Sequence, residues 1–232
     1  MASFITRQIP NTLTCCNLIS GCIATYMAFE GLTEMSLCFI IIGAVFDFFD
    51  GFAARLLHVS SPIGKELDSL ADDVTFGFAP SAIVFMLLRD LCSSALLPYA
   101  AFLMAAFSAL RLAKFNLDER QTSSFIGLPT PANALFWGAF TIGFGNLLAD
   151  YSWASVVILC MLVLSCFLLV AEIPMFALKF KHYGVRENAV RYFFLLTAVL
   201  LIVLLRTKGI ALAIVWYIVL SLLTQKRQNT KI

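Results

Sequence analysis

Long apolar stretches alternate with short polar ones along most of the chain, and this pattern predicts a bundle of membrane-spanning helices. We expect eight helices, at about residues 9–29, 35–57, 65–88, 93–114, 132–148 and 153–178, then one that ends near residue 205 and one at 209–223. The last two are short and closely joined, so a re-entrant hairpin is an alternative for them. Pro80 lies inside the third helix, where its missing N–H should kink the helix and open space beside it.

Composition supports an all-α, polytopic membrane protein. Hydrophobic residues make up 61% of the 232 and charged residues only 13%, which is more apolar surface than a soluble domain of this size needs. The net charge of +2 is too small to indicate a nucleic-acid partner. The seven cysteines form no Cys-x-x-Cys pair and indicate neither a zinc site nor a disulfide framework. We expect a transmembrane core, residues 1–178, followed by a C-terminal part, 179–232, with a basic connector, the hairpin and a tail.

Basic residues are distributed unevenly between the two ends of the expected helices. With eight spans, all but three of the sixteen Lys and Arg residues fall on the side of both termini, and the three exceptions are Arg89, Arg206 and Lys208. By the positive-inside rule both termini then face the cytoplasm. The loop at 57–64 lies on the same side, so the sequence predicts a multi-pass protein of the cytoplasmic membrane with a cytoplasmic site.

Four carboxylates interrupt the apolar pattern. Asp47 and Asp50 are i,i+3 neighbours near the end of the second expected helix, and Asp68 and Asp72 are i,i+4 neighbours near the start of the third. A carboxylate in hydrocarbon is costly, so such residues normally face a polar cavity or bind a ligand. The turn residues at 60–64 should fold the third helix back beside the second, so that the two pairs meet. Clustered Asp oxygens favour Mg²⁺, Mn²⁺ or Ca²⁺ over Zn²⁺.

Small residues and one arginine accompany these carboxylates. Gly51, Ala54 and Gly64 leave room for helices to approach and for a bulky ligand, and Arg55 offers a partner for a phosphate. An ion network that only fixed helix register would demand more basic residues nearby than Arg55 and Lys65. The stretch resembles the signature of the CDP-alcohol phosphatidyltransferase family, D-x-x-D-G-x-x-A-R-x8-G-x-x-x-D-x-x-x-D. Its defined positions are filled by Asp47, Asp50, Gly51, Ala54, Arg55, Gly64, Asp68 and Asp72.

The resemblance implies a six-helix core, to which this chain adds about two C-terminal helices, and a transferase that uses a CDP-linked alcohol and releases CMP. Two ions, Mg²⁺ or Mn²⁺, would neutralise the diphosphate. Their implied ligands are Asp47, Asp50, Asp68 and Asp72. The resemblance makes Asp72 the general base for the acceptor hydroxyl, and it implies a homodimer. The expected nucleotide contacts are Asn17, Asp50, Gly51, Ala54, Arg55, Gly64 and Asp68.

Further stretches are similar to bacterial membrane-integral phosphatidylserine synthases: P-N-x-x-T-x-x-N from Pro10, L-R-L-A-K-F-N at 110–116 and G-L-P-T-P at 127–131. Lys114 and Thr130 replace the Arg and Ser that are usual there. An amino-acid acceptor needs a cation for its carboxylate. The expected serine contacts are Arg111, Lys114, Asn116 and Thr130, although basic residues at helix ends also serve as membrane anchors. The expected reaction converts CDP-diacylglycerol and L-serine to phosphatidylserine and CMP within the lipid membrane.

Two alternatives stay open at this point. The acceptor could instead be glycerol 3-phosphate, inositol phosphate or choline, since Arg111, Lys114 and Arg120 can also form a pocket for a phosphorylated acceptor. From a different class, intramembrane carboxylates mark the ion pathways of cation transporters. A pathway predicts carboxylates throughout the bilayer depth, whereas the second half of the chain has only Glu172 near a span.

Overall fold

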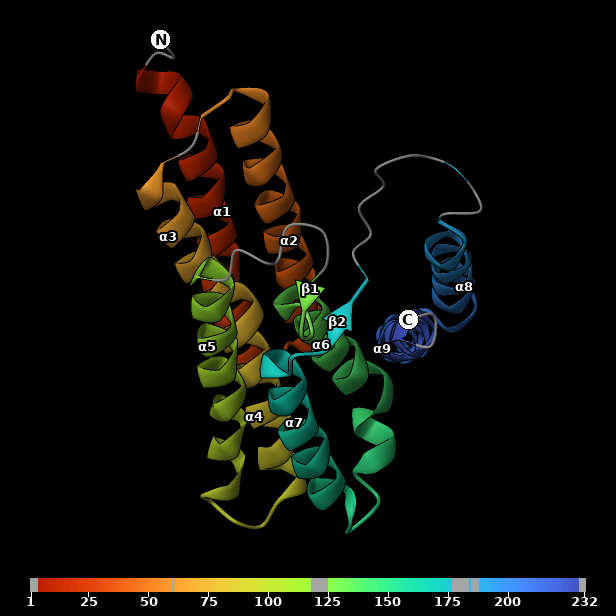
Figure 1. The fold of residues 1–232 in the computed structure, drawn as a ribbon. Helices are drawn as coiled ribbons and strands as arrows, with labels where there is room; N and C mark the ends of the chain where they lie inside the picture. Colours follow the sequence, from red (N-terminus) through yellow and green to blue (C-terminus); the bar gives the residue numbers. More distant parts are fainter. Residues whose placement is uncertain (1–3, 60, 118–124, 177–183, 185–187, 230–232) are drawn as a thin grey trace.

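The computed structural model describes residues 4–59, 61–117, 125–176, 184 and 188–229, which form a bundle of helices (Figure 1). The helices are α1 (Phe4–Phe29), α2 (Thr33–Leu56), α3 (Pro62–Asp72), the π-helical turn η1 (Asp73–Phe78), α4 (Ala79–Leu91), the 3₁₀ segment η2 (Leu97–Phe102), α5 (Leu103–Leu117), α6 (Thr130–Leu148), α7 (Ala154–Val170), α8 (Ala189–Leu205) and α9 (Thr207–Asn229). Two short strands, β1 (Phe125–Ile126) and β2 (Pro174–Met175), pair with each other.

Several of these helices are suited to a membrane. Five helical stretches are long and apolar enough to cross one, namely Gln8–Phe29, Thr33–Leu56, Pro62–Leu91, Leu97–Leu117 and Thr207–Thr224. Helices α7 and α8 are apolar but shorter, with 17 residues each. Many large apolar side chains are exposed, for example Phe48 at 62%, as expected for helices whose outer faces contact lipid. The prediction of an all-α polytopic membrane protein is confirmed, and eight complete spans stay a prediction.

Helices α1 and α2 pack closely against the stretch that runs from α3 into α4 (Figure 1). Thr75 of η1 lies in the crossing, fully buried, and its hydroxyl donates to the backbone carbonyl of Asn17 at 3.0 Å. A Cβ at Gly43 would lie 2.5 Å from the Thr75 methyl and 2.9 Å from Asn17 Oδ1. Only glycine at position 43 therefore permits this close approach of α1, α2 and η1. The contact fixes the register of these three elements one turn away from Asp47 and Asp72.

The distortion expected at Pro80 takes the form of a wider helical turn. Residues Asp73–Phe78 are π-helical, and the N–H of Ala79 donates to the carbonyl of Val74. Because Pro80 has no N–H, the regular i→i−4 ladder is interrupted at this point. The Ser81 hydroxyl donates to the Gly77 carbonyl at 2.7 Å and satisfies one carbonyl of the turn. The third expected helix is thus one continuous stretch with a π-helical centre.

The sixth expected helix ends much earlier than predicted. Helix α7 stops at Val170, and Ala171 has an extended backbone. Pro174 follows and cannot donate to a helical ladder, and it disfavours helical backbone in the preceding residue. Instead β2 pairs antiparallel with β1, with Phe125 opposite Met175. The prediction of helix through residues 171–176 was wrong, and 177–178 lie outside the described residues.

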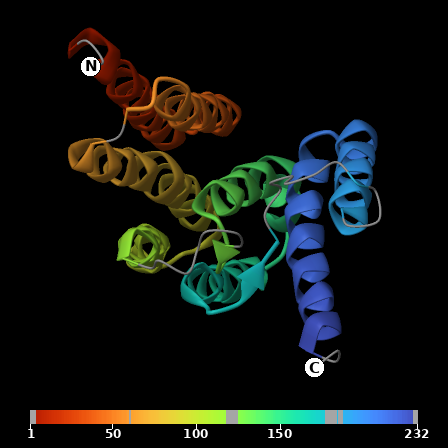
Figure 2. The same ribbon diagram turned by 45° about the horizontal axis from the view of Figure 1, so that its top comes forward.

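The C-terminal hairpin consists of α8 and α9, and α9 lies between α8 and α6 (Figure 2). The turn between the two helices is one residue, Arg206, with a positive φ of 52°. A buried apolar cluster joins the hairpin to the strands and to the start of α6; its members are Leu128, Met175, Phe194, Ala198, Ala213, Tyr217 and Leu220. The hairpin therefore packs on the rest of the bundle. The boundary predicted at 178/179 lies outside the described residues.

Candidate active site

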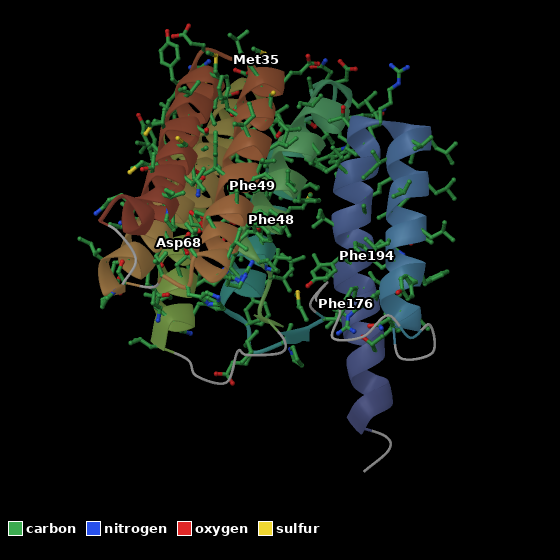
Figure 3. The ribbon with its side chains drawn as sticks, turned by 90° about the horizontal axis from the view of Figure 1, so that it is seen from above. Met35, Phe48, Phe49, Asp68, Phe176 and Phe194 are labelled. Atoms are coloured by element: carbon green, nitrogen blue, oxygen red, sulfur yellow. The ribbon has the colours of Figure 1, made fainter. Side chains whose placement is uncertain are left out.

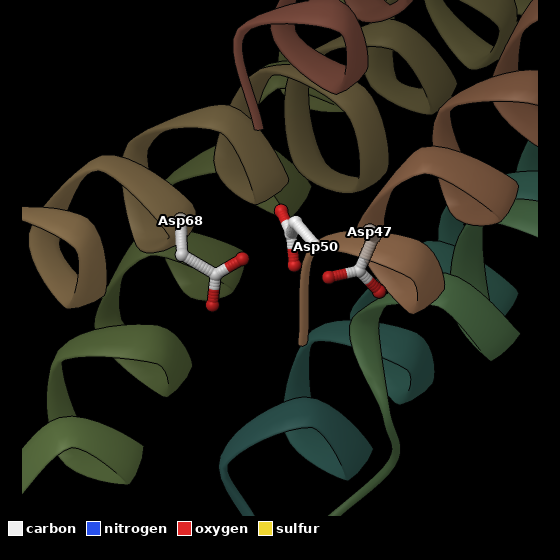
Figure 4. A group of neighbouring side chains, drawn as sticks. All are labelled: Asp47, Asp50 and Asp68. Atoms are coloured by element: carbon white, nitrogen blue, oxygen red, sulfur yellow. The ribbon is translucent and has the colours of Figure 1, made fainter. Parts of the chain in front are cut away.

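Three carboxylates from α2 and α3 converge beside α1 (Figure 4). One oxygen from each of Asp47, Asp50 and Asp68 lies within 4.8 Å of the other two. We call these three residues the acidic triad. Their convergence follows from the i,i+3 pair on the last turns of α2 and from the turn after it, which lets α3 return beside α1. The predicted meeting of carboxylates across two helices is thus present in the structure, but α3 packs against α1 and not, as expected, beside α2.

Helix α1 orients two of the carboxylates through two buried polar side chains. Thr14 Oγ1 donates to Asp50 Oδ2 at 2.6 Å, and Asn17 Nδ2 donates to Asp72 Oδ1 at 3.0 Å. Asp72 lies outside the acidic triad but interacts electrostatically with Asp47 and Asp68. The structure therefore brings three of the four predicted metal ligands together and places the fourth beside them, with one of its oxygens engaged by an amide.

The acidic triad fits a hard divalent cation. Asp68 Oδ1 is buried and accepts no hydrogen bond. Within the described part of the chain, no Lys or Arg nitrogen lies within 4.0 Å of Asp47, Asp50, Asp68 or Asp72. Crowded carboxylates in an apolar bundle require a compensating positive charge, and oxygen-only donors match Mg²⁺, Mn²⁺ or Ca²⁺. The acidic triad therefore fits a metal ion, because no described lysine or arginine neutralises its negative charge.

A cavity of about 690 Å³ opens beside the acidic triad, within the size range of small-ligand sites. Residues from α1, α2, α3 and the intervening loop line it: Gln8, Pro10, Asn11, Thr14, Asp50, Gly51, Ala54, His58, Val59, Ser61, Ile63, Gly64, Lys65 and Asp68. Five of the predicted nucleotide contacts are in this set. The other two are not: Asn17 is buried against Asp72, and Arg55 is exposed beside Gly51.

The N-terminus of α3 forms part of the cavity wall. Ser61 caps this helix, and its Oγ accepts from the Gly64 N–H at 3.0 Å, while Pro62 occupies the first helical position. A Cβ at Gly64 would lie 3.0 Å from both Ser61 Oγ and Asn11 Oδ1. A helix N-terminus favours negative charge, so a diphosphate in the cavity would benefit from it as well as from a metal.

Arg111 forms a second buried polar group, on α5. It is 7% exposed, and its Nη1 donates to Thr130 Oγ1 of α6 at 3.3 Å. Its Nε is buried without a partner, and no described carboxylate lies within 4.0 Å, although Asp72 interacts with it electrostatically. A buried guanidinium without an ion pair is costly unless an anion binds there. The structure therefore joins two of the four predicted acceptor contacts.

The other two predicted acceptor contacts, Lys114 and Asn116, form no hydrogen bond with Arg111 or Thr130 in the described structure, and their role stays a prediction. Lys114 is exposed on α5. Asn116 ties α5 to α3, because its Nδ2 donates to Ser69 Oγ at 2.8 Å and its carbonyl accepts from Lys65 Nζ at 2.7 Å. Those contacts give Asn116 a structural role in the described part of the molecule. Arg120, considered for a phosphorylated acceptor, lies outside the described residues.

Sequence reasoning missed the polar group next to Thr130. Asn133 lies one turn later on α6 and is 1% exposed, and its Nδ2 is buried without a partner. Its Oδ1 accepts from Ser165 Oγ, which in turn accepts from Trp137 Nε1 at 3.1 Å. The i,i+3 spacing from Thr130 to Asn133 was the available signal.

Comparison with known proteins places these features in context. A family model described as CDP-alcohol phosphatidyltransferase matches residues 7–168. Three similar proteins are named CDP-diacylglycerol–serine O-phosphatidyltransferase. The one from Bacillus subtilis is 40% identical over 131 residues, covering 54% of this chain and 70% of that protein. The one from Mycobacterium leprae is 32% identical over 178 residues, covering 72% and 57%. The one from Methanocaldococcus jannaschii is 35% identical over 143 residues, covering 62% and 63%.

Proposed function

The chain belongs to the CDP-alcohol phosphatidyltransferase family, and we propose that it is a membrane transferase of phospholipid biosynthesis that makes phosphatidylserine. It moves the phosphatidyl group of CDP-diacylglycerol to the hydroxyl of L-serine and releases CMP. The relatives described above are named for this activity. The observation that carries the proposal is the acidic triad beside a cavity of about 690 Å³.

The metal ligands of this proposal are the acidic triad, with Asp72 as the fourth carboxylate beside it. Bound Mg²⁺ or Mn²⁺, two ions in the proposal, would neutralise the diphosphate and stabilise negative charge on the transferring phosphoryl group. Thr14 supports this arrangement because its hydrogen bond fixes one oxygen of Asp50 and directs the other toward the remaining carboxylates.

Asp72 is the proposed general base. The Asn17 amide holds Oδ1, which leaves Oδ2 to accept the proton of the serine hydroxyl. The serine oxygen then attacks the phosphorus that carries the diacylglycerol. The bond from that phosphorus to the bridging oxygen breaks, and CMP leaves with the electron pair. Asn17 thus acts in the proposal by orienting the base, and its predicted nucleotide contact stays a prediction.

The cavity is the proposed CDP site. Gly51 leaves space on α2, since a Cβ there would meet only Arg55 Nη1, at 3.9 Å. The α3 N-terminus and Lys65 supply positive potential at the opposite wall. Ala54 of α2 and Gly64 of α3 also line these two walls. This arrangement suits an anionic nucleotide that lies between α2 and α3.

Arg111 is the proposed partner of the serine carboxylate. Its unpaired Nε and its Nη1 contact with Thr130 leave a buried cation that an anion would satisfy. Asp72 interacts electrostatically with the same guanidinium, which is consistent with a base that acts on an acceptor held by Arg111. A single described buried cation suits a carboxylate better than a phosphomonoester, which carries more charge.

The proposal also includes an orientation of the bundle in the membrane. Asp68 and the C-terminal end of α9 lie toward one end of the bundle and Met35 toward the other (Figure 3). We propose that the Asp68 end faces the cytoplasm, as the distribution of basic residues predicts. The basic residues at 120, 179, 181, 186 and 231 that contribute to this prediction lie outside the described residues. A homodimer stays a prediction from the family.

The test is an acceptor panel with the purified full chain in mixed micelles containing CDP-diacylglycerol and Mg²⁺ or Mn²⁺. CMP release should rise with L-serine and not with glycerol 3-phosphate, inositol phosphate or choline. No stimulation by serine would contradict the proposed acceptor. Flux of the metal into liposomes without any CMP release would instead support the transporter alternative.

A further inference from the structure

The C-terminal hairpin lies beyond residues 7–168, the region matched by the family model, yet it packs on Met175 of β2 and on Leu128, two residues before Thr130. We infer that Tyr217 of α9 is a positioning residue for acceptor binding, acting through the strand pair that leads to Thr130, the hydrogen-bond partner of Arg111. The inference rests on the proposed function. It assigns the hairpin a role in acceptor affinity and none in nucleotide binding.

The first step is the contact between Tyr217 and the segment after β2. Tyr217 is 6% exposed, and its hydroxyl donates to the backbone carbonyl of Phe176 at 2.9 Å. Its ring packs edge-on against Phe176, with centroids 4.8 Å apart, and against Phe194 at 5.6 Å. Figure 3 shows Phe176 and Phe194 at the hairpin, toward the same end of the bundle as Asp68. A buried phenol whose hydroxyl donates to a backbone carbonyl helps to fix where that backbone lies.

The second step runs from β2 to Thr130. Strand β2 pairs with β1, and directly after β1 the N–H of Gly127 donates to the Ile173 carbonyl at 2.9 Å. Gly127 has a φ of 78°, and a Cβ there would lie 2.6 Å from the Leu169 carbonyl. The Leu128 N–H donates to the Leu168 carbonyl at 2.8 Å. The segment that leads into α6 is therefore held on one side by α7 and β2, and its position depends on theirs.

The third step joins this segment to the cation. Thr130 is the first residue of α6, is fully buried, and accepts from Arg111 Nη1. Tyr217 interacts electrostatically with Arg111, as Asp72 also does. Through Phe176 and the strand pair, the phenol hydroxyl therefore affects the position of Thr130, the threonine that contacts the guanidinium. The cavity beside the acidic triad is lined by α1, α2, α3 and the loop between α2 and α3, and has no residue of the hairpin or the strand pair.

The experiment compares kinetic constants of the full-length Tyr217→Phe variant with those of the unaltered protein. This substitution removes one hydroxyl and keeps the ring contacts. We expect the KM for serine to rise roughly threefold to tenfold, the range for loss of one hydrogen bond, while the KM for CDP-diacylglycerol changes less than about twofold. Trp216→Phe is the matched control, because it removes a bond of similar length within the hairpin, from Trp216 Nε1 to Thr197 Oγ1 at 3.0 Å. Both its KM values should match those of the unaltered protein.

Three results for the KM values would overturn the inference. An unchanged KM for serine in Tyr217→Phe, an equal rise in both KM values, or the same effect in Trp216→Phe would overturn the inference, because a merely structural role produces one of these. If the unaltered protein uses another acceptor, the serine assignment fails and the same comparison is made with that acceptor. If it releases no CMP with any acceptor, the proposed function fails, and this inference fails with it.

Discussion

At the scale of single residues, the chemistry of this protein depends on how neutral side chains hold charged ones. Thr14 and Asn17 are one helical turn apart on α1, and each donates to a different carboxylate. Neither side chain carries charge, so both orient Asp50 and Asp72 without supplying the positive charge that the carboxylates lack. With hydroxyl and amide donors the negative charge of the carboxylates stays uncompensated, so a metal ion is still needed. A lysine or arginine at the same positions would neutralise that charge.

Asp72 should be essential for turnover and dispensable for nucleotide binding. Asp72→Asn keeps the size of the side chain and removes its basicity, so kcat should fall by about 10²- to 10⁴-fold, the usual contribution of a general base. Equilibrium binding of CMP should change little, since Asp72 does not line the cavity. Radiolabelled serine incorporation and CMP binding measure the two quantities. Activity near that of the unaltered protein would rule out the proposed role.

Thr14 should control metal affinity. Thr14→Val removes the donor to Asp50 while keeping the side-chain volume, and an outer contact to a metal ligand typically affects affinity by about tenfold or more. We expect a Mn²⁺ titration of activity, and Mn²⁺ binding followed by electron paramagnetic resonance, to shift weaker by roughly that factor. Thr12→Val is the control, because the exposed Thr12 hydroxyl donates only to the Gln8 carbonyl in the described structure. Equal metal affinity in both variants would contradict the role of Thr14.

At the scale of elements, α1 to α4 form one tightly packed unit whose closest crossing lies next to the site. Thr75 of η1 contacts both α1 and α2 there, at Gly21 and Gly43. Because protein interiors transmit small displacements, the spacing of the carboxylates depends on this crossing. The π-helical turn adds to this, since it sets the rotation of α4 relative to Asp68 and Asp72 on α3.

Gly43→Ala should therefore destabilise the protein and lower its activity together. The added methyl would contact the Thr75 methyl at 2.5 Å and the Asn17 amide at 2.9 Å, and such overpacking costs about 1–3 kcal/mol. Thermal unfolding in detergent and CMP release measure the two effects. Gly184→Ala is the control, because no described atom lies within 4 Å of a Cβ there. A variant at position 43 with unchanged unfolding temperature would show that the crossing is looser than described.

The sequence predicted those parts of the fold that depend on local pattern. Apolar periodicity located the helices, and the spacing of Asp47, Asp50 and Asp68 predicted that they converge. It did not predict the strand pair, because two-residue strands carry no periodicity and depend on long-range contact. It also did not predict that the Asn116 side chain joins α5 to α3, and the acceptor contact expected of Asn116 stays a prediction. A motif position identifies the residue type, and only packing decides which neighbour that residue meets.

At the scale of the whole molecule, α2 separates a polar interior from lipid. Asp47, Asp50 and Ala54 face the site, while Phe48, Phe49 and Phe52 are each between 47% and 62% exposed. The Phe48 and Phe52 rings stack on each other on that outer surface, with centroids 6.4 Å apart. A donor with a polar diphosphate and two acyl chains can thus place its head at the acidic triad and keep its tails in the bilayer along the same helix.

The orientation of the bundle gives the last prediction. In the proposed reaction the site exchanges CMP and serine with the cytoplasm, and all but three of the sixteen basic residues fall on one side of the predicted spans. A green fluorescent protein fused after Ile232 should therefore fluoresce, because it folds in the cytoplasm and not after export. Alkaline phosphatase inserted at Gly31, in the turn between α1 and α2, should be active, because that turn lies at the end of the bundle opposite Asp68. Alkaline phosphatase fused after Ile232 is the matched control and should be inactive. The reverse pattern would place the acidic triad outside the cell, where nucleotide and serine are scarce, and would contradict both the topology and the proposed reaction.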